Sequence, residues 1–145
     1  MTPDVNVLIA ASRSDHPHHP TALPWLNDAL AACVQGQTLN LWPMVLTGFL
    51  RLVTHPKVFP DPTPVEQALA FVEAVKARPG VRVPKLGAEL PTLHALCLQH
   101  QLTGNRIPNA WIAACVLASG DHLSTFDRDF KTLLPARSVT ILKAG

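Results

Sequence analysis

The strongest constraint on the fold is an alternation of short apolar runs with longer segments of helical periodicity. The short runs are expected to hold buried strands within 5–11, 38–42, 81–86, 122–126 and 139–143, the first of them passing into a helix or turn. Apolar residues that recur three and four positions apart predict helices over 19–36, 43–55, 65–80, 89–104 and 108–120, with a short helical turn over 128–134. Strands separated by helices favour a mostly parallel sheet with helices on both faces. We therefore expect a single α/β domain over residues 1–145.

The composition is that of a globular protein, with 48% hydrophobic residues and a formal net charge of +2. This mildly basic balance permits a nucleic-acid partner without requiring one. Cys33, Cys97 and Cys115 are odd in number and far apart, which is typical of reduced core cysteines in a cytosolic protein. No basic segment precedes an apolar run at the N-terminus, and no apolar run approaches the roughly 20 residues of a membrane span. We expect a cytoplasmic protein without a membrane segment.

Acidic residues lie beside two of the expected strands. Asp4 stands directly before the apolar run 5–11, and Asp127 and Asp129 follow the run 122–126. Ligands of parallel sheets collect at the carboxyl ends of strands, and carboxylates gathered there repel each other unless a cation neutralises them. Such oxygen ligands suit Mg²⁺ or Mn²⁺, which can activate water against a phosphodiester. The alternative is that Asp127 caps the following helical turn and that Asp129 is only solvated.

Three other groups of residues are candidates for a functional role. The histidines of "DHPHH" (15–19) crowd one loop without a distant ligand at zinc spacing, which favours an exposed lead-in to the next helix. Arg51 lies on a polar helix stripe, where it could bind RNA phosphate, pair with the acidic residues or simply face solvent. Trp25, Trp42 and Trp111 are expected in the core or in an interface, because no basic residues are interleaved with them.

Four segments together resemble the PIN-domain ribonucleases, and most of all the VapC toxins of bacterial toxin–antitoxin pairs. In chain order they are "TPDVNVLIAASRSDHPHH", "FLRLVTHPKVF", "IPNAWIAA" and "LSTFDRDF". The resemblance implies a PIN-like, Rossmann-like three-layer α/β/α fold that holds Mg²⁺ or Mn²⁺ and cleaves RNA. It also implies a homodimer, and a VapB-type antitoxin whose tail covers the acidic site.

The resemblance assigns roles to several residues by position. Asp4 would be the first metal ligand and Asp127 the late acidic ligand, with Asp129 as a further candidate. The supporting polar residues that it implies are Asn6, Ser124 and Thr125. A metal-activated water would then attack the phosphodiester in line and leave a 3′-hydroxyl and a 5′-phosphate.

Two positions depart from the family pattern. Asn109 stands where relatives usually have aspartate, and Gly48 stands where many have glutamate. Asn109 could cap the helix 108–120, or it could be a neutral ligand that lowers metal affinity. The leading hypothesis is a VapC-type endoribonuclease toxin that uses Asp4, Asp127 and Asn109. The alternatives are a PIN-fold binding protein with weakened or lost catalysis, or an engineered Asp→Asn change at position 109.

Overall fold

The computed structural model describes residues 1–143 as an alternation of helices and short strands. The helices are α1 (Val5–Ser12), α2 (His19–Val34), α3 (Pro43–Val53), α4 (Val65–Lys76), α5 (Leu90–His100) and α6 (Ile107–Ser119). The strands are β1 (Thr2–Pro3), β2 (Leu39–Asn40), β3 (Val81–Arg82), β4 (Leu123–Thr125) and β5 (Val139–Ile141). Short 3₁₀ turns are η1 (Gly104–Arg106), η2 (Arg128–Thr132) and η3 (Ala136–Ser138). Every element predicted after residue 18 is confirmed; most are shorter than predicted, and α6 begins one residue earlier, at Ile107.

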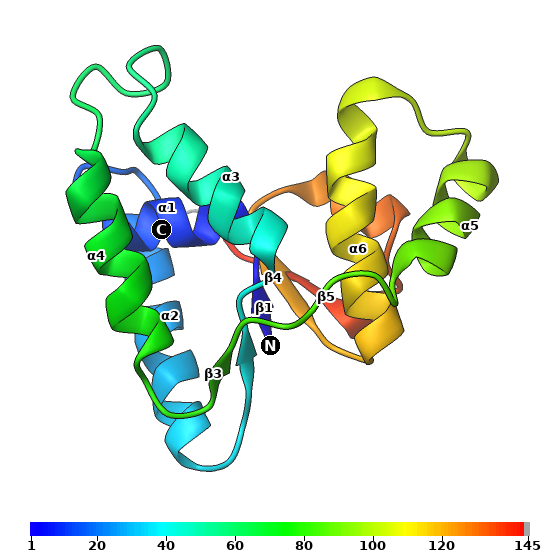
Figure 1. Ribbon diagram of the computed structural model, residues 1–145, viewed down its shortest axis with the longest axis horizontal. Coiled ribbons are helices and arrows are strands. Elements are labelled where there is room, and N and C mark those ends of the chain that lie inside the picture. The colour runs from blue at the N-terminus through cyan, green and yellow to red at the C-terminus, as the bar shows by residue number, and fades with distance from the viewer. Residues whose placement is uncertain (144–145) are drawn as a thin grey trace.

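The strands form a parallel sheet between two groups of helices. Strands β1, β4 and β5 pair in that order, and β2 pairs with β3, always in parallel. The Asn40 N–H donates to the Met1 carbonyl at 2.8 Å, which sets β2 beside β1. Figure 1 shows α1, α2, α3 and α4 on one side of the strands and α5 with α6 on the other. The predicted three-layer α/β/α architecture is therefore confirmed.

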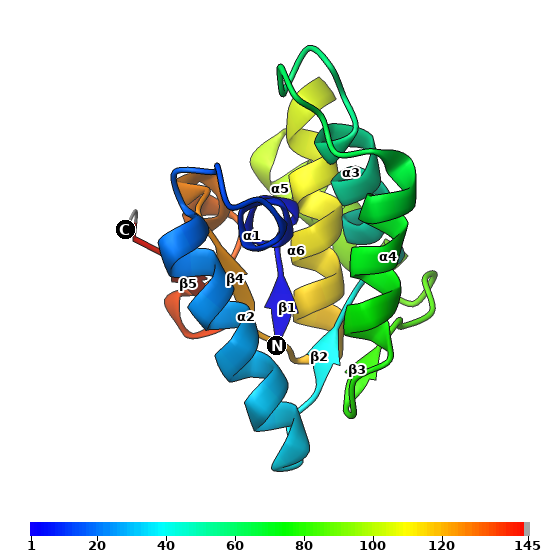
Figure 2. The ribbon, with the colours of Figure 1, turned by 90° about the vertical axis from the view of Figure 1, so that its left-hand side faces the viewer.

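The first strand was misplaced by the sequence prediction. The expected strand within 5–11 is wrong: β1 occupies only Thr2–Pro3, and residues 5–12 form α1. Asp4 Oδ1 accepts the Val5 N–H at 2.7 Å and caps this helix. Residues 7–11 are all buried, and Figure 2 shows α1 end-on among the other helices. The β-branched run therefore reflects a helix buried on nearly all sides, not a strand.

The core is built around α1 and α6. Ala110, Ala113 and Ala114 are buried on α6, where their small side chains let neighbouring elements approach closely, and Phe49 of α3 is fully buried. Trp42 is also buried, as predicted, and its Nε1–H donates to Thr2 Oγ1 at 3.1 Å. Within residues 1–143, no helix is long and apolar enough to span a membrane.

The three cysteines are free thiols, as predicted. Cys33 and Cys115 are buried and Cys97 is half-buried. Burial, with a smaller contribution from the Glu89 charge, raises the pKa of the Cys115 thiol to about 12. A thiol with such a pKa is not a nucleophile at neutral pH, so this residue is a packing element.

Asp121 ties together the amino ends of the strands. Its Oδ1 lies 2.7 Å from the Met1 amino group, and its Oδ2 accepts bonds from Thr2 Oγ1 at 2.6 Å and Asn40 Nδ2 at 2.8 Å. These residues belong to or flank β1, β2 and β4. The cluster lies at the amino ends of β1 and β4, the edge opposite to the one at which parallel sheets bind ligands, so its role is structural.

Candidate metal-binding and active site

The carboxyl ends of β1 and β4 bring the predicted acidic residues together. Pro3 pairs with Ser124 in the parallel register, so Asp4 and Thr125 follow as neighbours on adjacent strands. The Asp4 N–H donates to the Ser124 carbonyl at 2.9 Å, which continues the ladder by one step. Asp127 follows two residues after β4 and lines the same cavity as Asp4. The predicted meeting of Asp4 and Asp127 at one sheet edge is therefore confirmed.

Thr125 contacts both acidic residues at this edge of the sheet. Its Oγ1 donates to Asp4 Oδ2 at 2.6 Å and accepts the Asp127 N–H at 2.9 Å. The Asn6 amide Nδ2 also donates to Thr125 Oγ1 at 3.3 Å, and Asn6 Oδ1 accepts the Phe126 N–H at 3.3 Å. One hydroxyl thus orients the first carboxylate and the backbone of the second. Asn6 and Thr125 thus position the acidic residues, and their supporting role in a metal site stays a prediction.

Asp4 is a buried carboxylate, with 5% of its surface exposed. Burial raises its pKa, although the Thr125 hydroxyl and the Val5 N–H lower it, and the Asp127 charge raises it further. A raised pKa means that the surroundings destabilise the ionised form of Asp4 relative to its protonated form. A cation between Asp4 and Asp127 would stabilise the ionised form, so the electrostatics of the pair favour cation binding.

Asp127 has a structural role as well as a place in the cavity. Its Oδ1 accepts the Asp129 N–H at 2.9 Å and caps η2, which confirms the capping role considered from the sequence. Its Oδ2 accepts the Asn109 Nδ2 at 3.1 Å. Each carboxylate oxygen has a second lone-pair direction, so these two bonds leave ligand capacity on Asp127.

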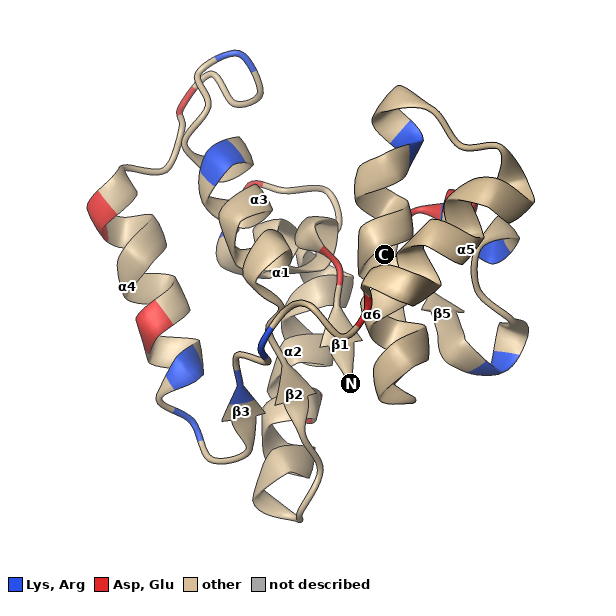
Figure 3. Ribbon diagram, turned by 45° about the vertical axis from the view of Figure 1, so that its right-hand side comes forward, with Lys and Arg blue, Asp and Glu red and all other residues tan. Residues whose placement is uncertain are grey.

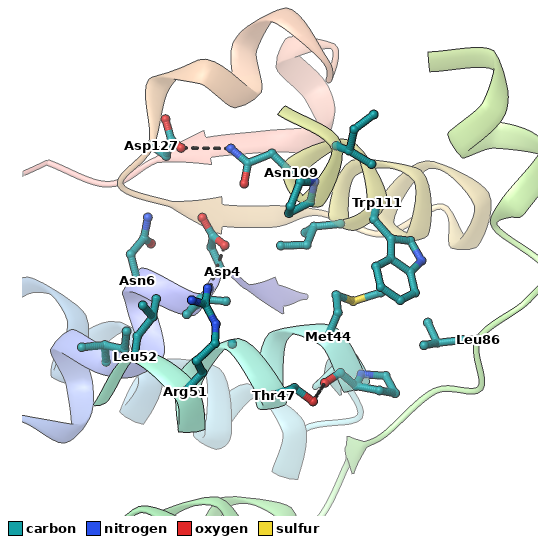
Figure 4. A pocket seen from close by; sticks show the side chains of 17 residues that line it. Asp4, Asn6, Met44, Thr47, Arg51, Leu52, Leu86, Asn109, Trp111 and Asp127 are labelled. Atoms are coloured by element: carbon teal, nitrogen blue, oxygen red, sulfur yellow. Dashed lines mark hydrogen bonds between the residues drawn. The ribbon is translucent and has the colours of Figure 1, made fainter. Parts of the chain in front are cut away.

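Asn109 does not cap its helix, so that interpretation is wrong. The 3₁₀ turn Gly104–Arg106 leads directly into α6, whose N-cap is Arg106 without a side-chain capping bond. Asn109 is therefore the third helical residue, and its side chain faces Asp127 across the cavity edge. Its amide oxygen is turned to the side of the cavity where Asp4 lies (Figure 4). The geometry leaves the neutral-ligand interpretation in place.

The carboxylates occupy one end of a cavity of about 760 Å³. Arg51 and Thr47 of α3 lie along its rim, and its opposite end is apolar, with Met44, Leu86 and Trp111 (Figure 4). Among residues 1–143, the ion pairs do not include Arg51, whose side chain is exposed. Of the three predicted roles of Arg51, pairing with the acidic residues is therefore not realised, and its guanidinium is free to bind phosphate.

Three predicted site residues do not line the cavity: Asp129, Ser124 and Thr125, although the Thr125 hydroxyl contacts both acidic residues that do. Asp129 is exposed and does not line it, so the geometry lends no support to a metal-binding role. Ser124 is buried and contributes its backbone carbonyl to Asp4, but its side chain does not line the cavity either. On a strand, successive side chains point to opposite faces, which separates Ser124 from Thr125.

Gly48 lies on the cavity wall where α3 approaches α1. A Cβ atom at this position would lie 3.0 Å from Val5 Cγ2. The absence of a side chain thus permits close helix packing beside Asp4, and it also leaves this wall of the cavity without a carboxylate.

Sequence reasoning missed the pairing of Trp111 with Glu89. The indole Nε1–H donates to Glu89 Oε2 at 2.7 Å, and the Gly87 N–H donates to Glu89 Oε1 at 2.6 Å. Trp111 is half-buried and packs against the core, as predicted, but part of it lines the cavity. No spacing rule pairs a residue before one helix with a residue inside the next, so no sequence signal could have found this contact.

The histidines of the 15–19 loop do not form a zinc site. His19 Nδ1 lies 2.8 Å from the Ala10 carbonyl, and His18 stacks on Phe126 with ring centroids 4.4 Å apart. Over residues 1–143, no group of three or more His, Cys, Asp or Glu side chains is placed to hold a metal. The lead-in interpretation is therefore favoured, although His16, His18 and His19 are half-buried, not fully exposed.

The donor set at Asp4 and Asp127 fits Mg²⁺ or Mn²⁺ better than a softer metal. It consists of two carboxylates with the amide oxygen of Asn109 nearby, and it contains no sulfur or imidazole. Mg²⁺ is commonly bound by one or two carboxylates and keeps several waters, so two carboxylates are sufficient. Lys and Arg are scattered along the chain in α3, α4, β3, the loops and the 3₁₀ turns, and α5 and α6 carry none (Figure 3).

Comparisons with known proteins show the family and the fold of the chain. No model of a protein family matches the chain. It is 40% identical over 139 residues to ribonuclease VapC31 of Mycobacterium tuberculosis, covering 94% of both chains. It is 39% identical to ribonuclease VapC25 of that species, again over 94% of both chains. The fold matches the crystal structure of VapBC2 from Rickettsia felis bound to a promoter DNA fragment, with a TM-score of 0.67, 16% identity and 98% of both chains covered. By these relatives, the chain belongs to the VapC ribonuclease family.

Proposed function

We propose that the protein is a Mg²⁺- or Mn²⁺-dependent endoribonuclease that acts in the cytoplasm as the toxin of a VapBC-type pair. The observation that carries this proposal is the convergence of Asp4 and Asp127 from two adjacent strand ends on one cavity. The relatives named ribonucleases support the reaction class.

The proposed roles follow from the contacts of each residue. Asp4 and Asp127 would hold the metal, with the Asn109 amide oxygen as a neutral third donor. When bound, the metal would supply activation of water and neutralisation of charge on the phosphodiester. Thr125 keeps Asp4 in position through its 2.6 Å bond, and Asn6 in turn orients Thr125. The Arg51 guanidinium would bind a phosphate of the RNA, and hydrolysis would leave a 5′-phosphate and a 3′-hydroxyl.

The proposed partners are single-stranded RNA, a VapB-type antitoxin and a second copy of this chain. The Rickettsia felis structure is named as a VapBC complex, which supports an antitoxin for this chain as well. A segment that carries arginine and apolar side chains would complement a cavity with carboxylates at one end and an apolar wall at the other. Such a segment would compete with both the metal and RNA.

A second candidate is a VapC-like binding protein with weakened or lost catalysis. The observation that favours it is the Asn109 amide, which gives Asp127 a hydrogen-bond donor where a third carboxylate is usual in the family. The site then carries less negative charge and binds a divalent cation less tightly.

Metal-dependent cleavage of single-stranded RNA of random sequence distinguishes the two candidates. We expect cleavage with Mn²⁺ that EDTA abolishes. Asp4→Ala and Asp127→Ala should each reduce it by at least about 100-fold, as the loss of a group that stabilises transition-state charge does. Asp129→Ala, outside the cavity, is the matched control and should stay within about threefold. If neither the native chain nor Asn109→Asp cleaves RNA, and Asp4→Ala changes nothing, the nuclease is excluded and the binding protein remains.

A further inference from the structure

The cavity continues well beyond the carboxylates. Its remaining wall is mostly apolar and comes from three parts of the chain: Met44 on α3, Leu86 in the segment before α5, and Trp111 on α6. A volume of about 760 Å³ lies in the range of roughly 300–1,000 Å³ that is typical of small-molecule sites. Metal ligation and phosphate binding at Asp4, Asp127 and Arg51 leave this apolar part unused.

Trp111 is held in place by a buried carboxylate. Glu89 is 3% exposed, and its two oxygens accept the indole N–H and the Gly87 N–H. Among the described residues, no cation pairs with Glu89. Burial raises the pKa of Glu89, but the hydrogen bonds from the indole and from the Gly87 N–H outweigh it and lower the pKa, so the ionised carboxylate holds both donors. It fixes the indole of Trp111 and, through Gly87, the segment that carries Leu86.

We propose that the apolar part of the cavity, walled by Trp111, Met44 and Leu86, binds one unstacked base of the RNA next to the phosphate held at the carboxylates. This inference rests on the proposed ribonuclease function and deepens it. Glu89 is then a positioning residue, which acts on the base only through the Trp111 indole.

Two features favour an RNA base as the ligand of the apolar part: the cavity is continuous from the carboxylates to the indole, and the indole is aromatic. Phosphate and base belong to the same nucleotide chain, and the carboxylates and the indole line the same cavity. Proteins that recognise single-stranded RNA commonly stack splayed bases on aromatic side chains. Arg51, on the rim of this cavity and without an ion pair among residues 1–143, complements the negative RNA backbone.

A double-mutant cycle tests the proposal: one change removes a base from the RNA, and the other replaces Trp111 in the protein. The cut site is first mapped on random single-stranded RNA, and oligonucleotides with one abasic ribose are then made at each flanking position. With the native chain, we expect one position at which base removal lowers kcat/KM by about tenfold. With Trp111→Leu, the same removal should change kcat/KM by less than about twofold. Equal losses with both proteins at every position would overturn the proposal.

Two further variants separate the base contact from general damage to the fold. Trp111→Phe keeps an aromatic face and should retain most of the sensitivity to base removal. Trp25→Leu alters another half-buried tryptophan, on α2 and outside the cavity, and should leave that sensitivity unchanged. If Trp25→Leu lowers the sensitivity as much as Trp111→Leu does, the effect is not local and the proposal fails.

A binding measurement decides the matter even if the chain does not cleave RNA. The Trp111 indole N–H resonance is assigned by its loss in Trp111→Phe, and the native chain is titrated with AMP or with ribose 5-phosphate in Mg²⁺. We expect AMP to shift this resonance and ribose 5-phosphate, which lacks the base, to leave it in place. Equal shifts, or no shift with AMP, would overturn the base site. A shift only with a short peptide of arginine and leucine would overturn it in favour of a protein ligand.

Discussion

The Asn109 amide nitrogen donates a 3.1 Å hydrogen bond to Asp127 Oδ2, and this bond joins the first turn of α6 to the segment after β4. The amide therefore satisfies one carboxylate oxygen and leaves its own oxygen on the cavity side (Figure 4). A carboxylate at position 109 would instead face Asp127 at hydrogen-bond distance, where two negative charges require a cation or a shared proton.

The first prediction concerns Asn109→Asp. Without metal, the variant should lose about 1–3 kcal/mol of unfolding free energy, because a hydrogen bond is replaced by charge repulsion. With Mn²⁺, it should bind the ion about tenfold more tightly than the native chain and regain stability. Calorimetric Mn²⁺ titration and urea unfolding in EDTA or Mn²⁺ measure both effects. Asn109→Ala, which adds no charge, should bind Mn²⁺ no more tightly than the native chain, and equal Mn²⁺ affinities of Asn109→Asp and the native chain would contradict the prediction.

The second prediction concerns the Thr125 hydroxyl. Thr125→Val keeps the shape of the side chain but leaves Asp4 Oδ2 and the Asp127 N–H without their partner. We expect a loss of about 2–3 kcal/mol in urea unfolding, since unsatisfied buried polar groups are costly. Thr125→Ser retains the hydroxyl and should lose less than half as much. Equal losses in the two variants would show that the methyl group, not the hydroxyl, carries the stability.

The third prediction is a pH dependence from Asp121. Burial raises its pKa, but bonds from the Met1 amino group, Thr2 and Asn40 outweigh burial and hold the pKa below its ordinary value. A carboxyl with a depressed folded pKa stabilises the protein above its unfolded pKa of about 3.9, and this contribution is lost as the pH falls through the folded pKa.

Asp121→Asn should therefore be less stable than the native chain by about 2 kcal/mol at neutral pH. The difference should stay constant from pH 7 to about pH 5 and shrink as the pH falls below about 4. Urea unfolding at a series of pH values measures it. Asp28→Asn, an exposed carboxylate on α2 without an ion pair among residues 1–143, is the control. A difference that persists unchanged at pH 3 would contradict the assignment.

The fourth prediction concerns the close approach at Gly48. Alanine in place of a mid-helix glycine normally adds about 1 kcal/mol of stability. Here the new methyl group would meet Val5 Cγ2 at 3.0 Å, so Gly48→Ala should add clearly less than that. In a Val5→Ala background the contact is absent, and the full gain of about 1 kcal/mol should appear. Thermal unfolding of the four proteins measures the coupling, and simple additivity would contradict it.

The fifth prediction concerns Arg51 as a phosphate contact. Arg51→Gln should weaken binding of single-stranded RNA in EDTA and reduce the slope of log affinity against log salt by about 1. Arg78→Gln, which changes an exposed arginine outside the cavity, should leave the slope unchanged. Fluorescence anisotropy with a labelled random oligonucleotide at several salt concentrations gives both values. Identical slopes for Arg51→Gln and the native chain would exclude the contact.

Periodicity predicted most of the secondary structure because most segments obey one local rule. The α6 segment begins near Pro108 and ends at Gly120, which adopts a left-handed conformation with φ of 66°. The exception is the run 5–11, where β-branched residues suggested a strand. Its helical state depends on the Asp4 cap and on burial by surrounding elements, and neither is visible in a local window.

The candidate site was predictable only in part. Asp127 was found because it follows an expected strand, and parallel sheets bind ligands at the carboxyl ends of their strands. Asp4 precedes the run 5–11, so its assignment depended on the resemblance, and only the structure places it at the carboxyl end of β1. The sequence did not exclude Asp129, because two carboxylates two positions apart in a loop can each point either way. Only the turn of η2, capped by Asp127, separates the two.

The sequence by itself determined the order of helices and strands after residue 18, the layered α/β class and the candidate acidic residues, because these follow from local periodicity and from chemistry carried by single side chains. Only the tertiary structure decided that Thr125 joins Asp4 to Asp127, that Asn109 is a donor to Asp127 and not a helix cap, and that Glu89 holds Trp111 on the cavity wall. These are contacts between elements distant in the chain, and they depend on how helices and strands pack in three dimensions, which no local spacing encodes.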